Sequence, residues 1–175
     1  MSSNKIYRIP FEGLKTGKHT FEFEISNEFF EELEYSIIRQ GDLKAVFTLD
    51  KKENMMVGDV IITGTVTTAC DRCTDPVENH IETQHQLVFK FSDEPSDDED
   101  LITLPSNVFA IDTSPIFYEL MTVSLPSRTV HEENSCNEEM LRLIKEYTGS
   151  AKQTKASEKK MNTGDPRWDA LKNLN

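Results

Sequence analysis

Alternation of apolar and polar residues dominates the first ninety positions of the chain. The pattern is clearest at residues 21–25, 43–49, 60–66 and 77–91. In each stretch most of the apolar side chains share one parity and most of the polar side chains take the other, which is the period of a half-buried strand. A shorter β-prone run at 6–11 contains Pro10, which suits a sheet edge. Because short turns separate these segments, they favour hairpins and predict an antiparallel sheet.

Apolar residues recur at helical spacing in four short segments, at residues 27–40, 114–125, 138–147 and 165–175. In the first, Phe29, Phe30, Leu33 and Ile37 would form one apolar face, and Gly41 would end the helix. Together with the strands, these helices predict a single α+β domain over residues 1–147. We expect an antiparallel, strongly curved or barrel-like sheet with a few short helices over it.

Two stretches contain few or no apolar residues that could be buried. Residues 93–100 carry six carboxylates, so they predict a mobile acidic loop. Residues 148–164 are rich in Lys, Ser and Thr and predict a flexible basic linker. Beyond it, residues 165–175 predict a short C-terminal helix or tail, where Asp165 can cap and Pro166 can take the first helical position.

The composition indicates a protein of the cytoplasm. No run of eighteen apolar residues occurs, and residues 1–5 lack the apolar core of a signal peptide, so no membrane partner is expected. Three cysteines with one CxxC pair do not make a disulfide framework. In a reducing compartment that pattern indicates metal or redox chemistry.

The charge of the chain is unevenly distributed. The formal net charge is −12, and residues 151–175 hold six Lys or Arg against three Asp or Glu, which leaves about −15 on residues 1–150. Binding of nucleic acid over the whole surface is therefore disfavoured, because phosphate contacts need Lys and Arg. An acidic body with a basic tail fits a basic protein partner, such as a ribosomal protein.

Cys70 and Cys73 lie in the turn that joins the two longest predicted strands. The third cysteine, Cys136, follows His131 in another turn-like segment. Three thiolates and one imidazole are the ligand set of a closed tetrahedral zinc site, so we expect a structural zinc clasp. His80, nearer to the CxxC pair, is a rival fourth ligand. Free thiols that stabilise the turn are the other alternative. His85 falls on the apolar parity and is expected in the core.

Redox catalysis fits this turn less well than zinc does. A reactive CxxC would precede a helix, whose N-terminus lowers the thiol pKa, whereas here a strand pattern follows. Arg72 is either a salt-bridge partner for the neighbouring aspartates or a contact for a partner's phosphate or carboxylate. In the tail, the candidate partner contacts are Lys152, Lys155, Lys159, Lys160, Arg167 and Trp168.

Signatures of enzymes are missing from the sequence: there is no glycine-rich phosphate loop, no HExxH and no GxSxG. We therefore expect a protein without catalytic activity. An enzyme that acts on RNA or thiols and a direct RNA-binding module are the alternatives.

The order of several short motifs resembles the YceD family. They are Gly64-Thr65-Val66 before Cys70-Asp71-Arg72-Cys73, then Ile111-Asp112, Leu125-Pro126, His131, Cys136, and Asp165-Pro166-Arg167-Trp168 with Leu171. The resemblance spans residues 60–174. It implies a role in ribosome assembly, with accumulation of large-subunit ribosomal RNA as its outcome and no known catalysis. A basic ribosomal protein or a pre-ribosomal particle would be the partner, and the tail could touch ribosomal RNA.

Overall fold

The computed structural model of the chain describes residues 6–92, 101–132 and 135–148. The predicted acidic loop at 93–100, and the predicted linker and tail beyond Thr148, lie outside the described residues. The chain divides into two compact units, Met1–Asn137 and Glu138–Asn175, which are described separately here. The predicted domain limits at residues 147 and 164 stay predictions.

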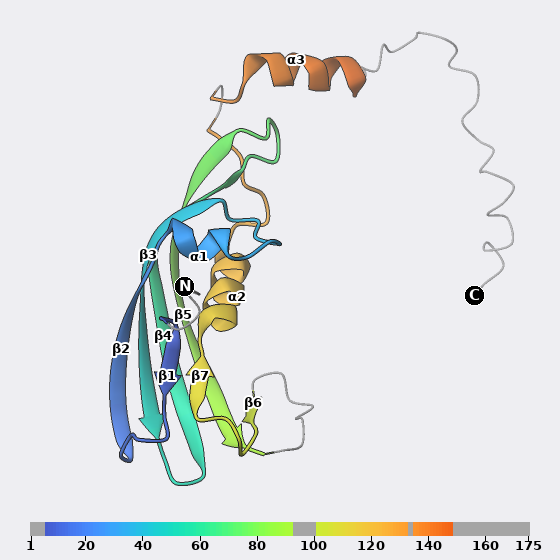
Figure 1. Cartoon of the computed structure of the whole chain (residues 1–175). Coiled ribbons are helices and arrows are strands. Elements are labelled where there is room, and N and C mark those ends of the chain that lie inside the picture. Colours follow the sequence, from blue (N-terminus) through green and yellow to red (C-terminus); the bar gives the residue numbers. More distant parts are fainter. Residues whose placement is uncertain (1–5, 93–100, 133–134, 149–175) are drawn as a thin grey trace, which may run out of the picture. The chain divides into compact units, whose positions relative to one another are not determined.

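The first unit contains all the strands and two of the helices that the structure describes (Figure 1). In chain order they are β1 (Arg8–Pro10), β2 (Gly17–Ile25), α1 (Asn27–Glu31), β3 (Gln40–Lys51), β4 (Met55–Ala69), β5 (Pro76–Phe91), β6 (Leu101–Leu104), β7 (Ala110–Asp112) and α2 (Ser114–Ser124). The second unit contains α3 (Glu138–Tyr147). The prediction of a mixed α+β fold is confirmed.

Five strands form the main sheet in the order β2-β3-β4-β5-β6, and β1 pairs with β7 in a separate antiparallel ribbon. The pairs from β2 to β5 are antiparallel, as predicted. The exception is β6, which runs parallel to β5. Within the described residues β2 and β6 do not pair, so the sheet is open and the barrel-like alternative is wrong there. The strong curvature of the sheet stays a prediction.

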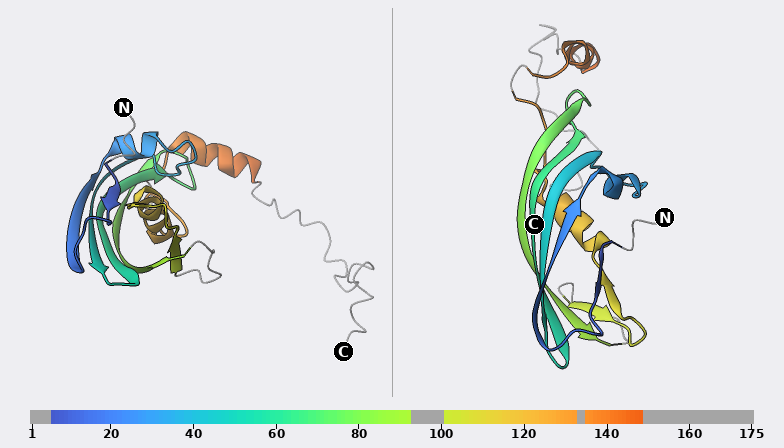
Figure 2. Two further views of the ribbon diagram at one scale, coloured as in Figure 1. Left: turned by 60° about the horizontal axis from the view of Figure 1, so that its bottom comes forward. Right: turned by 60° about the vertical axis from the view of Figure 1, so that its left-hand side comes forward.

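The core lies between the inner face of the sheet and α2 (Figure 2). Phe117 of α2 is fully buried, and its ring packs against Phe23 and Phe47, with centroid distances of 5.3 and 6.5 Å. Tyr7, from the segment before β1, adds a third ring at 6.4 Å. The alternation in the sequence thus results from one sheet face that is covered by α2 and one that is solvated.

The first predicted helix is shorter than its apolar spacing indicates. It ends at Glu31 rather than near Gly41, which instead belongs to β3. Phe29 and Phe30 are buried, so the helix already buries its apolar residues in one turn, whereas Ile37 is 56% exposed. The backbone N–H of Ile37 donates to the Tyr118 hydroxyl at 3.1 Å, which ties this segment to α2 outside any helix.

His85 does not belong to the core, and that prediction is wrong. It has the inward parity of β5 and lies opposite Val60, but its side chain is exposed. The neighbouring strand β6 pairs with β5 only from Val88 onward, so β6 offers no cover at His85.

The strand before the CxxC turn requires a glycine at position 64. The φ of Gly64 is +149°, and an added Cβ would lie 2.3 Å from the carbonyl oxygen of Asp42 and 2.6 Å from the Cα of Leu43. No other residue type fits so close a backbone approach at this dihedral angle.

The second unit contributes α3, whose predicted limits are confirmed. Its apolar residues, which include Met140 and Ile144, lie on one side of the helix, and none of them is buried. Glu138 and Glu139 in the first turn and Lys145 in the last complement the helix dipole. None of the described helices is long and apolar enough to cross a bilayer.

Candidate metal centre

The turn between β4 and β5 presents two sulfur atoms on one side. The backbone N–H of Cys70 donates to the Asp75 carbonyl at 2.8 Å, and that of Thr74 donates to the Cys70 carbonyl at 2.9 Å. Thr74 has a φ of 65°, in the left-handed region where glycine is more usual. These bonds close a tight turn around Cys70 and Cys73, as the CxxC spacing predicts.

The loop after α2 brings the other two candidate ligands to this turn. Helix α2 ends at Ser124, and Leu125 is extended, so the chain leaves the helix before Pro126. Further along this loop, the backbone N–H of Asp71 donates to the Thr129 carbonyl at 2.7 Å, and the Thr129 N–H donates to the Asp71 carboxylate at 2.7 Å. This two-way contact places His131 beside the cysteines.

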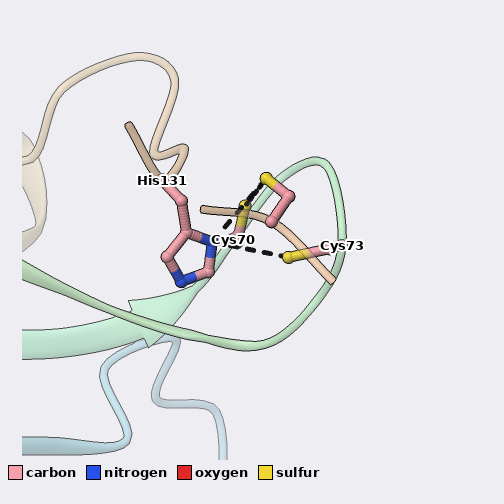
Figure 3. Close-up of side chains that lie close together, drawn as sticks. Cys70, Cys73 and His131 are labelled. Carbon is pink, nitrogen blue, oxygen red and sulfur yellow. Dashed lines mark hydrogen bonds between the residues drawn. The ribbon is translucent and has the colours of Figure 1, made fainter. Parts of the chain in front are cut away.

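The four candidate ligands form one compact group. Their ligating atoms all lie within 4.8 Å of one another. Figure 3 shows Cys70 and Cys73 from the turn and His131 from the facing loop, with their side chains directed at one another. The sulfurs of Cys70 and Cys136 are 4.0 Å apart, and Nδ1 of His131 is 3.4 Å from the Cys73 sulfur and 3.8 Å from that of Cys136.

These distances fit a tetrahedral zinc site. With bond lengths of about 2.3 Å to sulfur and about 2.0 Å to nitrogen, the edges of the tetrahedron are about 3.8 Å between sulfurs and about 3.5 Å between sulfur and nitrogen. The three cysteines are free and buried, with at most 5% of each exposed. Zinc held by these four ligands would cross-link the turn and the loop. It would not offer a catalytic position, because three thiolates and an imidazole leave no open coordination site for a substrate.

The thiol of Cys70 is prepared for metal binding by its surroundings. Burial raises its pKa, but the backbone N–H groups of Cys73, Arg72 and His131 outweigh burial and bring the pKa down to about 6. A thiolate is the form that binds a metal. The lowered pKa therefore favours the metal-binding form of Cys70 near neutral pH.

His131 and Cys136 differ from Cys70 in the direction of their pKa shifts. The Pro76 carbonyl, at 2.9 Å from Nε2, is the main cause of the raised pKa of His131, and Cys70 adds to it. The same hydrogen bond orients the ring so that Nδ1 faces the sulfurs. In metal sites, the histidine nitrogen that does not bind the metal commonly donates to a carbonyl in this way. Burial is the main cause of the raised pKa of Cys136, and Cys73 and Cys70 add to it.

Arg72 lies against the sulfur atoms. Its backbone N–H is 3.5 Å from the Cys70 sulfur, and its guanidinium is 3.8 Å from the Cys136 sulfur. Among the described residues it forms no ion pair with Asp71 or Asp75, so the predicted salt bridge is not present. Its guanidinium instead places a positive charge beside the sulfur atoms, where it would compensate negative charge on the cysteines in a metal complex. Contact with a partner stays a prediction.

The remaining predicted site residues are outside this group. His80, the rival ligand, is exposed on β5 opposite Thr65. The predicted partner contacts in the tail, from Lys152 to Trp168, lie outside the described residues.

Sequence reasoning missed three residues that position the ligands. Asp71 and Thr129 join the turn to the loop, and Pro76 supplies the carbonyl that orients His131. The only sequence signal for Asp71 was its position between the two cysteines. Nothing in the sequence marks a backbone carbonyl as a partner.

Comparison with known protein families identifies the family of this chain. The family described as "Large ribosomal RNA subunit accumulation protein YceD" matches residues 58–175, which include the turn, the loop and all four candidate ligands. The chain belongs to the YceD family. The description of the YceD family names accumulation of large-subunit ribosomal RNA and no reaction. No curated protein and no solved structure matches the chain.

Proposed function

We propose that this protein is a cytoplasmic, non-catalytic factor that supports accumulation of large-subunit ribosomal RNA by binding a basic ribosomal protein or a pre-ribosomal particle. The description of the YceD family supports the link to ribosomal RNA. The closed ligand set of the metal centre supports a structural rather than a catalytic role.

The charge of the outer sheet face is the observation that carries the choice of partner. This outer face consists of the side chains that alternate with the buried ones along β2–β5. Its carboxylates are Glu22, Glu24, Asp42, Asp50, Asp59, Glu78 and Glu82. Its lysines are Lys18, Lys44 and Lys90, and Lys44 is already paired with Glu22 at 2.6 Å. Such an excess of negative charge attracts a basic protein and repels RNA phosphates.

Zinc would act in this proposal as a clasp. Bound by Cys70, Cys73, His131 and Cys136, it would tie the tip of the β4–β5 hairpin to the loop after α2. Direct contact with ribosomal RNA is assigned to the basic tail, where Lys152, Lys155, Lys159, Lys160, Arg167 and Trp168 are the candidate contacts. Removing residues 150–175 should therefore weaken the already weak binding of bare RNA.

The cellular test compares normal and depleted cells. Depletion should lower the amount of large-subunit ribosomal RNA and change the profile of precursor particles. The Cys70→Ser, Cys73→Ser double variant should restore the profile less well than the parent protein. Unchanged particle profiles after depletion would contradict the role in assembly.

The partner test uses charge reversal on the outer face. Glu78→Lys with Glu82→Lys should reduce capture of basic ribosomal proteins, and capture by the parent should weaken as salt rises through the physiological range. The matched control is Glu12→Lys with Glu53→Lys, which makes the same change of net charge at exposed positions off this face. Tight, salt-insensitive binding of RNA by protein without its tail would favour the direct RNA-binding alternative. Turnover of RNA or thiols that disappears in a folded site variant would favour an enzyme.

A further inference from the structure

The side chain of Asp71 connects the two halves of the metal centre without using a ligand atom. Its carboxylate accepts hydrogen bonds from the backbone N–H of Thr129 at 2.7 Å and from the Thr129 hydroxyl at 3.3 Å. The backbone N–H of Asp71 donates to the Thr129 carbonyl at 2.7 Å in the other direction. None of the three bonds involves a ligating atom.

The two residues occupy critical positions along the chain. Asp71 lies between the ligands Cys70 and Cys73, and Thr129 lies two residues before His131. Asp71 and Thr129 are 58 positions apart in the sequence. Without this contact, a metal that bound the turn would also have to order the loop and close a long segment of chain, and both steps oppose binding through entropy.

We propose that Asp71 is a positioning residue that assembles the metal centre before the metal binds, and that the zinc affinity of this protein depends on it. The inference rests on the zinc clasp proposed above and adds a residue that touches neither the metal nor its ligating atoms. Partners of this kind typically change metal affinity by about 10–100-fold when they are removed. We expect the lower part of this range, because the Asp71 side chain is exposed.

The contact between His131 and Pro76 cannot replace Asp71. It also joins loop and turn, at 2.9 Å, but it depends on a ring that is itself a ligand. A change at His131 would remove a ligand together with the contact. Asp71 can be changed while all four ligands remain, so its effect on affinity can be measured separately.

The test measures zinc affinity by competition with a chromophoric chelator for the parent protein and three variants. Asp71→Ala should bind zinc about 10-fold more weakly or worse and release it faster. Asp71→Asn should recover most of the affinity, because its amide oxygen can still accept from the Thr129 N–H. Asp75→Ala is the matched control in the same turn. The hydrogen bond that Asp75 accepts from the Cys70 N–H goes to its backbone carbonyl, which alanine retains. The absorption spectrum of the cobalt-substituted protein should show tetrahedral sulfur coordination in all four proteins.

Hydrogen exchange on the metal-free proteins tests assembly before binding. The Thr129 N–H should be protected in the parent and in Asp75→Ala and should exchange faster in Asp71→Ala. Equal zinc affinities for Asp71→Ala and Asp75→Ala would overturn the inference while the zinc clasp stands. An unprotected Thr129 in the metal-free parent would overturn assembly before binding. A parent protein that takes up no zinc would refute the clasp itself, which is a different result from an unchanged affinity.

Discussion

Replacing Cys136 with serine should remove most of the stability that zinc provides. Cys136 is the ligand farthest along the chain, and its sulfur lies 4.0 Å from that of Cys70 across 66 positions of sequence. A serine hydroxyl is a poor replacement for a thiolate, because it stays protonated at neutral pH. The variant would keep Cys70, Cys73 and His131, and we expect this three-ligand set to hold zinc too weakly to keep the turn and the loop joined.

The length of the closed segment sets the size of the effect. Cross-linking two positions 66 residues apart is worth about 4 kcal/mol in the chain-entropy relation. For a chain of this size, each kcal/mol changes the midpoint of thermal unfolding by about 2–4 °C. Cys136→Ser should therefore unfold at a temperature roughly 8–16 °C below that of the zinc-loaded parent.

Thermal unfolding with and without a chelator, together with metal analysis, tests this reasoning. Chelator should lower the unfolding temperature of the parent to near that of Cys136→Ser, and it should change the variant little. If the purified parent holds well under one zinc per chain and the variant melts at the same temperature, the clasp does not exist. If only the His131 assignment is wrong, Cys136→Ser still destabilises the protein and His131→Ala does not.

Three further predictions concern the core, a backbone position and a thiol. Phe117→Ala should lower the free energy of unfolding by about 3–5 kcal/mol in urea titrations. Val123→Ala, at a position 78% exposed, should change it by less than about 0.5 kcal/mol. Equal losses in the two variants would contradict the assignment of Phe117 to the core. Gly64→Ala should cost about 1–3 kcal/mol, and a neutral result in the same titration would show that β3 and β4 can separate there. In metal-free protein, ultraviolet absorbance should reveal one thiolate that forms near pH 6, absent in Cys70→Ser and kept in Cys136→Ser. Because the Cys70 pKa is lower in the folded state than its ordinary 9, this thiolate contributes stability in full above pH 9, and the contribution is lost as pH falls towards 6; an inflection unchanged in Cys70→Ser would refute the assignment.

The sheet could be predicted from the sequence because burial alternates with the strand period. Phe23 and Phe47 are buried under α2, whereas the residues directly before and after each of them are exposed or half-buried, so the physical cause of the pattern is local. The length of α1 could not be predicted in this way. Phe29 and Phe30 are already buried within one turn, and the bond from Ile37 goes to Tyr118, which lies 81 positions further along in another helix. The direction of β6 depends likewise on a neighbouring strand rather than on its own four residues.

The four candidate ligands could be predicted because metal binding depends on side-chain types, which the sequence states directly. A CxxC pair, a third cysteine and a nearby histidine have few joint uses apart from metal binding. The sequence favoured His131 and left His80 as a rival, and the structure supports His131 because the fold places the loop after α2 beside the turn. The bond between Pro76 and His131 could not be predicted, because any residue at position 76 would offer the same carbonyl.

The distance in sequence between the turn and the loop after α2 has a consequence for the order of folding. The hairpins from β2 to β5 join neighbouring segments, whereas the contact between Asp71 and Thr129 spans 58 positions. Contacts between distant segments form late, since the intervening chain must first become ordered. Because the loop directly follows α2, we expect it to settle against the turn after α2 has packed on the sheet. We therefore expect newly made chains to acquire the metal as one of their last steps, so that metal content would report how many chains have completed folding.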